Sequence, residues 1–154
     1  MRRLKTAAFA TIVLAVVAFT GVGAAVASAS PSARPAAVAS GSSALGHVIV
    51  DSRGHTLYLF EKDRRGTSAC SGACLAYWPP LLTSGTPTAI KGAQHALLGS
   101  IRRGDGMRQV TYAGHPLYRF FGDTKRGQTN GEGLKDFGAA WYALMPSGKK
   151  IDRD

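Results

Sequence analysis

The sequence is poor in cysteine and in acidic residues. It has two cysteines among 154 residues, and nine aspartates and glutamates against 19 lysines and arginines. Two cysteines allow a single disulfide bond. The formal net charge of +10 favours anionic partners. A run of five or six basic residues is missing, so we expect scattered surface charge and no specific binding of nucleic acid.

The usual catalytic and nucleotide-binding motifs are missing as well. No glycine-rich phosphate loop follows a strand pattern, and no Gly-x-Ser-x-Gly elbow occurs. The loop 123–133 has oxygen donors among glycines, but its spacing differs from that of a calcium loop and two basic residues interrupt it. We therefore predict no catalytic residue and no cofactor, and we favour a function that is not enzymatic.

The N-terminus has the pattern of an export signal. Arg2, Arg3 and Lys5 precede an apolar run without charges that ends in small residues at Ala29. This order is typical of a secretory signal peptide, so we predict a signal over 1–29 with cleavage after Ala29 and a secreted, extracytoplasmic protein. An uncleaved membrane anchor is the alternative. No cysteine lies near the cleavage region to accept a lipid, and after cleavage we expect no stable membrane span.

The rest of the chain divides into a linker and one domain. Residues 30–44 consist of Pro, Ala, Ser and Gly with one Arg and Val, which predicts a flexible stalk. Order is expected to begin near Leu45, in a domain over 45–154. Within that domain we predict a first repeat over about 46–83, a connector over 84–100 and a second repeat over about 101–150.

An internal duplication defines this domain. Residues 54–63 (GHTLYLFEKD) and residues 114–123 (GHPLYRFFGD) agree at six of ten positions, which indicates that one supersecondary unit is used twice. Each copy follows a β-branched run and a turn, a pattern that predicts a β-hairpin. A third strand, near Trp78 in one copy and at 140–144 in the other, is expected to close each unit. The predicted fold is mostly β, one compact domain of small β-sandwich or barrel-like form.

The strand pattern predicts which face of each hairpin is buried. Side chains alternate between the two faces of a strand, so the Tyr and Phe of each copy share one face. Because this face is aromatic in both copies, we expect it to form the core. The opposite face carries Leu117 and Arg119 in the second copy and is expected to be partly exposed.

The two cysteines predict a structural disulfide. Cys70 and Cys74 are an isolated pair in a chain with an export signal, where thiols are usually oxidised. A redox dithiol and a thiolate metal pair are the alternatives. The three-residue spacing differs from that of thioredoxin-type motifs, and no haem-attachment histidine follows Cys74.

The duplicated motif supplies the other candidate site residues. Duplicated motifs serve architecture more often than chemistry, so we interpret the motif as structural, with each aspartate accepting turn N–H groups or a tyrosine hydroxyl. A hydrolase that uses the two aspartates is a weaker alternative. His55 and His115 occupy equivalent turns and are weak candidates for binding a metal or haem iron. The motif residues are Tyr58, Phe60, Asp63, Tyr118, Phe120 and Asp123.

These residues resemble a known group of proteins. The motif Tyr-x-(Phe/Trp/Tyr)-x-x-Asp occurs at 58–63 and at 118–123, together with Cys-x-x-x-Cys at 70–74 and Trp-Pro-Pro-Leu at 78–81. This combination is similar to the secreted-repeat family of predicted bacterial lipoproteins, and the similarity extends over about 46–150. The resemblance implies no established activity. The missing lipid-accepting cysteine is a departure from the lipoprotein members and favours free secretion.

Taken together, these features predict a secreted or envelope-associated binding or structural module without catalytic activity. Its expected partner is an anionic polymer of the cell envelope or another envelope protein. The alternative is an extracytoplasmic redox protein or a protein that handles a metal or haem. It would use either the cysteine pair or the two turn histidines.

Overall fold

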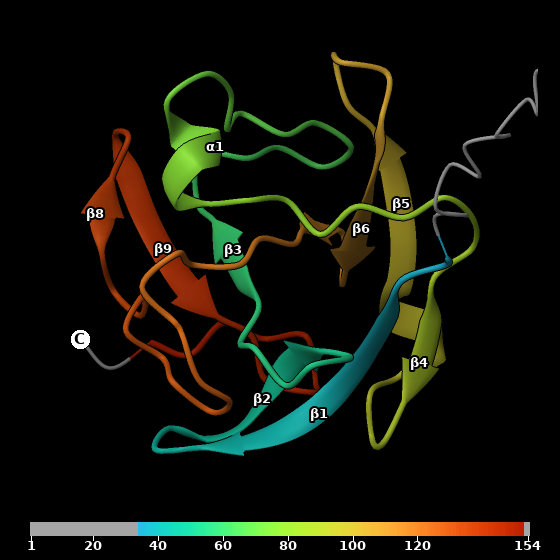
Figure 1. Ribbon diagram of the computed structural model, residues 1–154, viewed down its shortest axis with the longest axis vertical. Coiled ribbons are helices and arrows are strands. Elements are labelled where there is room, and N and C mark those ends of the chain that lie inside the picture. The colour runs from blue at the N-terminus through green and yellow to red at the C-terminus, as the bar shows by residue number, and fades with distance from the viewer. Residues whose placement is uncertain (1–33, 153–154) are drawn as a thin grey trace, which may run out of the picture. The chain divides into compact units, whose positions relative to one another are not determined.

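Short strands make up most of the regular structure in the computed structural model, which describes residues 34–152 (Figure 1). The strands are β1 (Ala37–Ser43), β2 (Gly46–Asp51), β3 (Tyr58–Phe60), β4 (Thr88–Ile90), β5 (Leu98–Arg102), β6 (Arg108–Tyr112), β7 (His115–Pro116), β8 (Lys135–Asp136) and β9 (Ala139–Ala143). They form three sheets of three strands, in the orders β2-β1-β4, β3-β9-β8 and β5-β6-β7. The one α-helix among these residues is α1 (Cys74–Tyr77). The mostly β fold is confirmed, and the predicted signal at 1–29 lies outside the described residues.

Each repeat begins with an antiparallel hairpin that precedes the motif. In the first, β1 pairs with β2 from Val38 opposite Asp51 to Ser43 opposite Gly46. In the second, β5 pairs with β6 from Leu98 opposite Tyr112. The chain then folds back a second time and starts a further antiparallel pair, β2 with the segment before β3 and β6 with β7. The predicted hairpins at the motifs are therefore present but short.

The stalk predicted over 30–44 is wrong for its described part. Strand β1 spans residues 37–43, pairs with β2 on one side and runs parallel to β4 on the other. Val38 is fully buried and Gly41 lies so close to Val50 that an added Cβ would stand 2.9 Å from it. A strand of small residues can approach its neighbours this closely, whereas its composition alone suggests a linker. Order thus begins well before Leu45.

The connector predicted over 84–100 also contains regular structure. Strand β4 extends the first sheet, and a 3-10 helix spans His95–Leu97. Strand β5 starts at Leu98, so the second repeat begins slightly before the predicted residue 101.

The closing strands are exchanged between the two repeats. Strand β9 of the second repeat pairs with β3 of the first, with Phe60 opposite Trp141 (Figure 1). In return, the first repeat's Leu81 donates its N–H to Leu117 O (2.9 Å) and accepts a bond from Val110 N (2.8 Å), both in the second repeat. The expectation that each third strand closes its own unit is therefore wrong, since each closes the other.

The aromatic face predicted to be the core is buried. Phe60, Trp141 and Trp78 stack nearly parallel, with ring centroids 4.0 Å and 3.9 Å apart, and Phe120 lies 4.6 Å from Trp78 at a tilt. The four rings come alternately from the two repeats. This arrangement couples the halves of the domain through the largest side chains in the core.

The opposite face of the motif strands is buried too. Leu57, Leu59 and Leu117 belong to a second apolar cluster, each at most 3% exposed. Arg119 is the exception, since its side chain is 36% exposed and its Nε donates to Asp51 Oδ2 at 2.6 Å. This face was expected to be partly exposed, and it is exposed to solvent only at Arg119. Burial on both faces explains why the motif strands have few polar positions.

Phe60→Ala is expected to destabilise both repeats at once. The substitution removes one ring of the stack and leaves a cavity, which costs about 3–5 kcal/mol of unfolding free energy. Urea denaturation followed by tryptophan fluorescence and by far-UV circular dichroism should give one coincident transition at a lower midpoint. Two separated transitions, with one repeat retaining the wild-type midpoint, would show that the repeats are independent domains.

Candidate functional site

The two motifs meet at their tyrosines. Tyr58 N–H donates to the carbonyl oxygen of Tyr118 at 2.8 Å, and Tyr118 N–H donates to that of Tyr58 at 3.0 Å. This reciprocal pair joins β3 of the first repeat to the motif segment of the second repeat. Both tyrosines are fully buried, so their hydroxyl groups need partners within the protein.

Each tyrosine finds its partner in the other repeat. Tyr58 donates its hydroxyl to Asp123 Oδ2 at 2.5 Å, and Tyr118 donates its hydroxyl to Asp63 Oδ2 at 2.9 Å. The second oxygen of each carboxylate accepts a backbone N–H, from Ala69 in one motif (2.7 Å) and from residue 130 in the other (2.9 Å). The aspartates thus accept both a turn N–H and a tyrosine hydroxyl, and the exchange between repeats is what the sequence did not show.

Burial raises the pKa of both motif aspartates and of both motif tyrosines. It raises the pKa of Asp63 to about 6, although the bonds from Ala69 and Tyr118 and the charge of Arg103 act in the opposite direction. Burial also raises the pKa of Asp123 above its usual value. The pKa of Tyr58 rises by burial and by its bond to the carboxylate, so the hydroxyl remains protonated.

A buried arginine, which the sequence analysis did not single out, supports this network. Arg103 is 8% exposed and donates to Ser68 Oγ at 2.8 Å, to Gln109 Oε1 at 2.6 Å and to the carbonyl of Cys70 at 3.0 Å. The Ser68 hydroxyl in turn bonds the Tyr118 hydroxyl at 2.7 Å. Nothing in the sequence distinguishes this arginine from its exposed neighbour Arg102, because two of its partners, Ser68 and Cys70, come from the other repeat.

The predicted disulfide is confirmed. Cys70 and Cys74 are bonded, with Cα atoms 5.5 Å apart, and they are 1% and 3% exposed. A catalytic or redox-sensing cysteine is usually accessible to its partner, which these sulfur atoms are not. Their burial favours a structural role for the bond, which fixes the turn that leads into α1.

The two turn histidines have different surroundings. His55 Nδ1 lies 3.7 Å from Asp51 Oδ2. His115 lies near Arg65, and burial and the charge of that arginine lower its pKa, so that it is neutral at pH 7. Within residues 34–152 no group of three or more His, Cys, Asp or Glu side chains is placed to hold a metal ion. For a metal or haem iron bound at these histidines, this part of the chain therefore supplies no further ligands.

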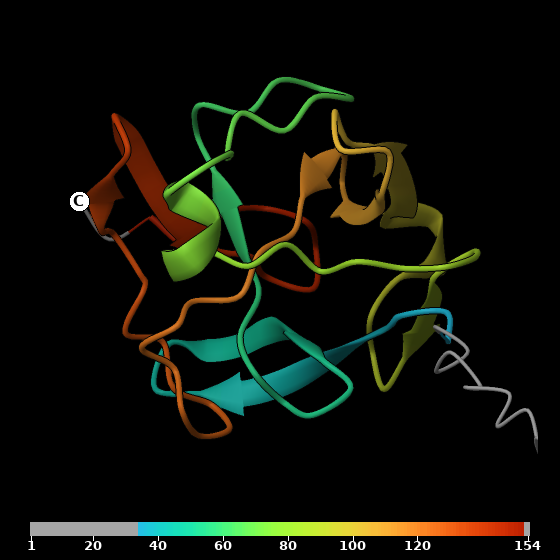
Figure 2. The same cartoon turned by 45° about the horizontal axis from the view of Figure 1, so that its top comes forward.

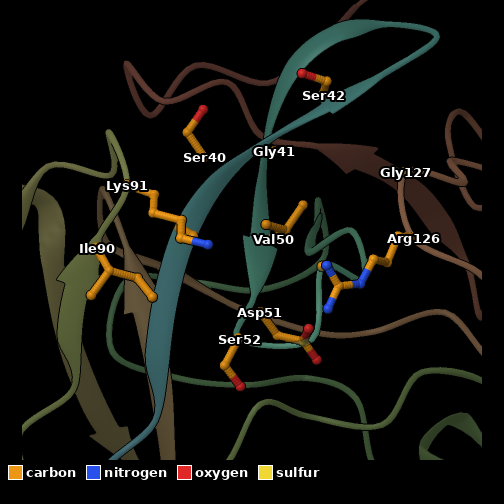
Figure 3. A pocket seen from close by; sticks show the side chains of 12 residues that line it. Ser40, Gly41, Ser42, Val50, Asp51, Ser52, Ile90, Lys91, Arg126 and Gly127 are labelled. Carbon is orange, nitrogen blue, oxygen red and sulfur yellow. The ribbon is translucent and has the colours of Figure 1, made fainter.

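A basic groove lies beside the first hairpin (Figure 3). Its volume is about 300 Å³, and Lys91 and Arg126 extend into it from opposite sides. Asp51 also lines the groove, but its carboxylate is bonded to Arg119. Burial alone would raise the pKa of Asp51, yet bonds from Arg119 and from backbone N–H groups outweigh burial and lower it, so the ion pair persists at neutral pH.

The glycines of this groove keep its walls close together. Gly127 has φ +72°, and an added Cβ would stand 2.8 Å from the carbonyl oxygen of Ser42. The loop that carries Arg126 can therefore lie directly against the β1–β2 hairpin (Figure 2). Sequence reasoning missed this groove because Lys91 and Arg126 are 35 positions apart and no local pattern links them.

These features define the class of the protein: a duplicated, mostly β domain whose two halves exchange their closing strands and motif bonds. A family model described as a secreted repeat of unknown function matches residues 40–82 and again residues 99–145. The chain belongs to this family of secreted repeats. Its two matches coincide with the two repeats of the structure, the first including most of β1. No curated protein and no solved structure matches the chain. No helix in residues 34–152 has the length and apolar character to cross a membrane.

Asp63→Asn is expected to flatten the dependence of stability on pH. Because the folded protein holds the Asp63 proton up to about pH 6 and the unfolded chain releases it near 3.8, the stabilisation from this proton is full below that range and is lost as the pH rises through 6. Urea titrations at pH 4.5 and pH 7 should show a smaller loss of unfolding free energy in the variant than in the wild type. Asp105→Asn removes a carboxyl whose pKa is lowered, and it should not reduce this loss. An unchanged difference between the two pH values in Asp63→Asn would contradict the assignment.

Replacing Cys70 and Cys74 together by Ala is expected to lower the melting temperature. The loop is short, so on the loop-entropy argument the cost stays below the roughly 3 kcal/mol of a fifteen-residue loop. Thermal denaturation measures the loss, and thiol titration of the denatured wild type without reductant should find no free thiol. Two titratable thiols in protein from an oxidising compartment would refute the structural role.

Proposed function

We propose that this domain is an extracytoplasmic binding module without catalytic activity, whose partner is an anionic polymer of the cell envelope. The basic groove carries the proposal. Lys91 and Arg126 face one hollow, and neither forms an ion pair with a carboxylate of residues 34–152. Unpaired cations on two walls of a groove favour a ligand with repeated negative charges.

The lining of the groove follows both strands of the first hairpin, at residues 39–42 and 50–52, which suits a chain more than a compact ligand. Hydroxyl-bearing residues also line the groove, and they can bond the polar backbone of a polymer. The excess of basic residues over the chain adds a long-range attraction that increases the rate of encounter. The family's description as secreted supports an extracytoplasmic location, where such polymers occur. The lining hydroxyl residues are Ser40, Ser42 and Ser52.

The double variant Lys91→Ala/Arg126→Ala is expected to bind anionic polymers about tenfold more weakly, which corresponds to about 1.4 kcal/mol. Long-chain polyphosphate and polyglutamate are suitable probes, and binding is measured by fluorescence anisotropy at two salt concentrations. Binding by the wild type should weaken at the higher salt concentration, because salt screens exposed charges.

Arg64→Ala/Lys135→Ala is the matched control. It removes the same charge from exposed positions that do not line the groove. Equal weakening in both double variants would show that net charge alone attracts the polymer, and absence of binding by the wild type would refute the proposal.

A further inference from the structure

The two copies of the motif differ in what covers the histidine beside each aspartate. Asp63 and His115 both line an open cavity of about 720 Å³. At the equivalent place in the other copy, His55 lies close enough to Asp123 to act on the pKa of its carboxyl. Neither of these two residues lines the adjacent basic groove. The pair Asp63 and His115 therefore lines a cavity, whereas the pair Asp123 and His55 does not line the groove beside it.

One substitution between the repeats explains the difference. Thr56 donates its hydroxyl to the carbonyl of Gln128 at 2.7 Å, and Gly127 N–H donates to Gly54 O at 3.3 Å, so the loop 124–128 is fixed over the first turn. The residue equivalent to Thr56 is Pro116, which has neither a hydroxyl nor an N–H to hold a loop.

The loop of the first repeat accordingly folds onto itself. Arg64 and Thr67 exchange backbone bonds of 3.2 Å and 3.0 Å, which close a tight turn, and Arg65 within this turn lies near Gly114 and the second turn histidine. Beside His115 a cavity remains, and Pro116 offers no bond equivalent to the one from Thr56 to Gln128. The volume of this cavity lies within the roughly 300–1,000 Å³ of small-molecule sites.

The cavity has polar groups of both signs. Asp63 and Glu61 supply carboxylate oxygens, whereas Lys149 supplies an ammonium group that has no acid partner among residues 34–152. The neutral ring of His115 can both donate and accept. Lys150 also lines the cavity but is already bonded to Glu61 at 2.7 Å and to Asp152 at 2.9 Å.

This combination matches a ligand that donates and accepts at many points. A bare anion would meet the two carboxylates, and a bare cation would meet the lysines. The hydroxyl groups of a sugar ring can donate to carboxylates and accept from an amine and an imidazole at the same time. We infer that the cavity between Asp63, His115 and Lys149 binds a saccharide unit, and that the second copy of this site is closed by the loop 124–128.

The test is binding of three monosaccharide probes, glucose, N-acetylglucosamine and glucuronate, to the full chain. Saturation-transfer NMR and calorimetry should detect at least one of them with the wild type. His115→Ala and Lys149→Ala should each weaken that binding at least fivefold. Neither side chain makes a hydrogen bond or ion pair in residues 34–152, so both variants are expected to keep the wild-type melting temperature.

His55→Ala and Lys125→Ala are the matched controls, because they change the same residue types at or near the covered copy. They should leave saccharide binding unchanged. Failure of all three probes to bind, or equal losses in the controls, would overturn the inference. The probes of the polymer experiment contain no sugar, so failure at the cavity and failure at the groove are separable outcomes.

Discussion

The structure depends on two hydrogen bonds between the repeats, one from the buried tyrosine hydroxyl of each repeat to the aspartate of the other. A buried phenol without a partner costs about 1–3 kcal/mol, and each repeat supplies the carboxylate that the other repeat's tyrosine needs. The two motif segments also bond through their backbones at Tyr58 and Tyr118. These bonds hold the two motif segments against each other. The exchanged closing strands and the alternating stack of four rings then follow, because each of them also brings parts of both repeats together.

Duplication has left the framework symmetric and the surface different. The tyrosines, aspartates, phenylalanines and tryptophans play equivalent roles in both halves. In contrast, the disulfide turn occurs in the first repeat alone. The bond from the first repeat's Thr56 to the loop 124–128 also has no counterpart, because Pro116 stands at the equivalent position of the second repeat. A framework fixed by exchanged contacts tolerates such changes in its loops, and the loops are where binding residues usually lie.

The sequence predicted the mostly β fold, the two repeats, the aromatic core and the disulfide, because each depends on local residue types and on identity between two segments. It failed for β1, whose Ala, Ser and Gly residues have no apolar period and become a strand only through the pairing with β2 and β4. It also missed the exchange of strands, Arg103 and the groove of Lys91 and Arg126. Those features depend on which repeat a segment meets, and the positions that the two repeats share carry no signal that distinguishes a segment's own repeat from the other one.

The exchanged strands have a consequence for a chain that contains a single repeat. Such a chain would have a motif strand without its neighbour and a closing strand without a place to bond. Two copies could satisfy each other by the same reciprocal contacts, which is the geometry of a two-fold homodimer formed by swapping. The linker between the repeats therefore converts what would be a concentration-dependent assembly into an intramolecular one, with a folded state whose stability is independent of dilution.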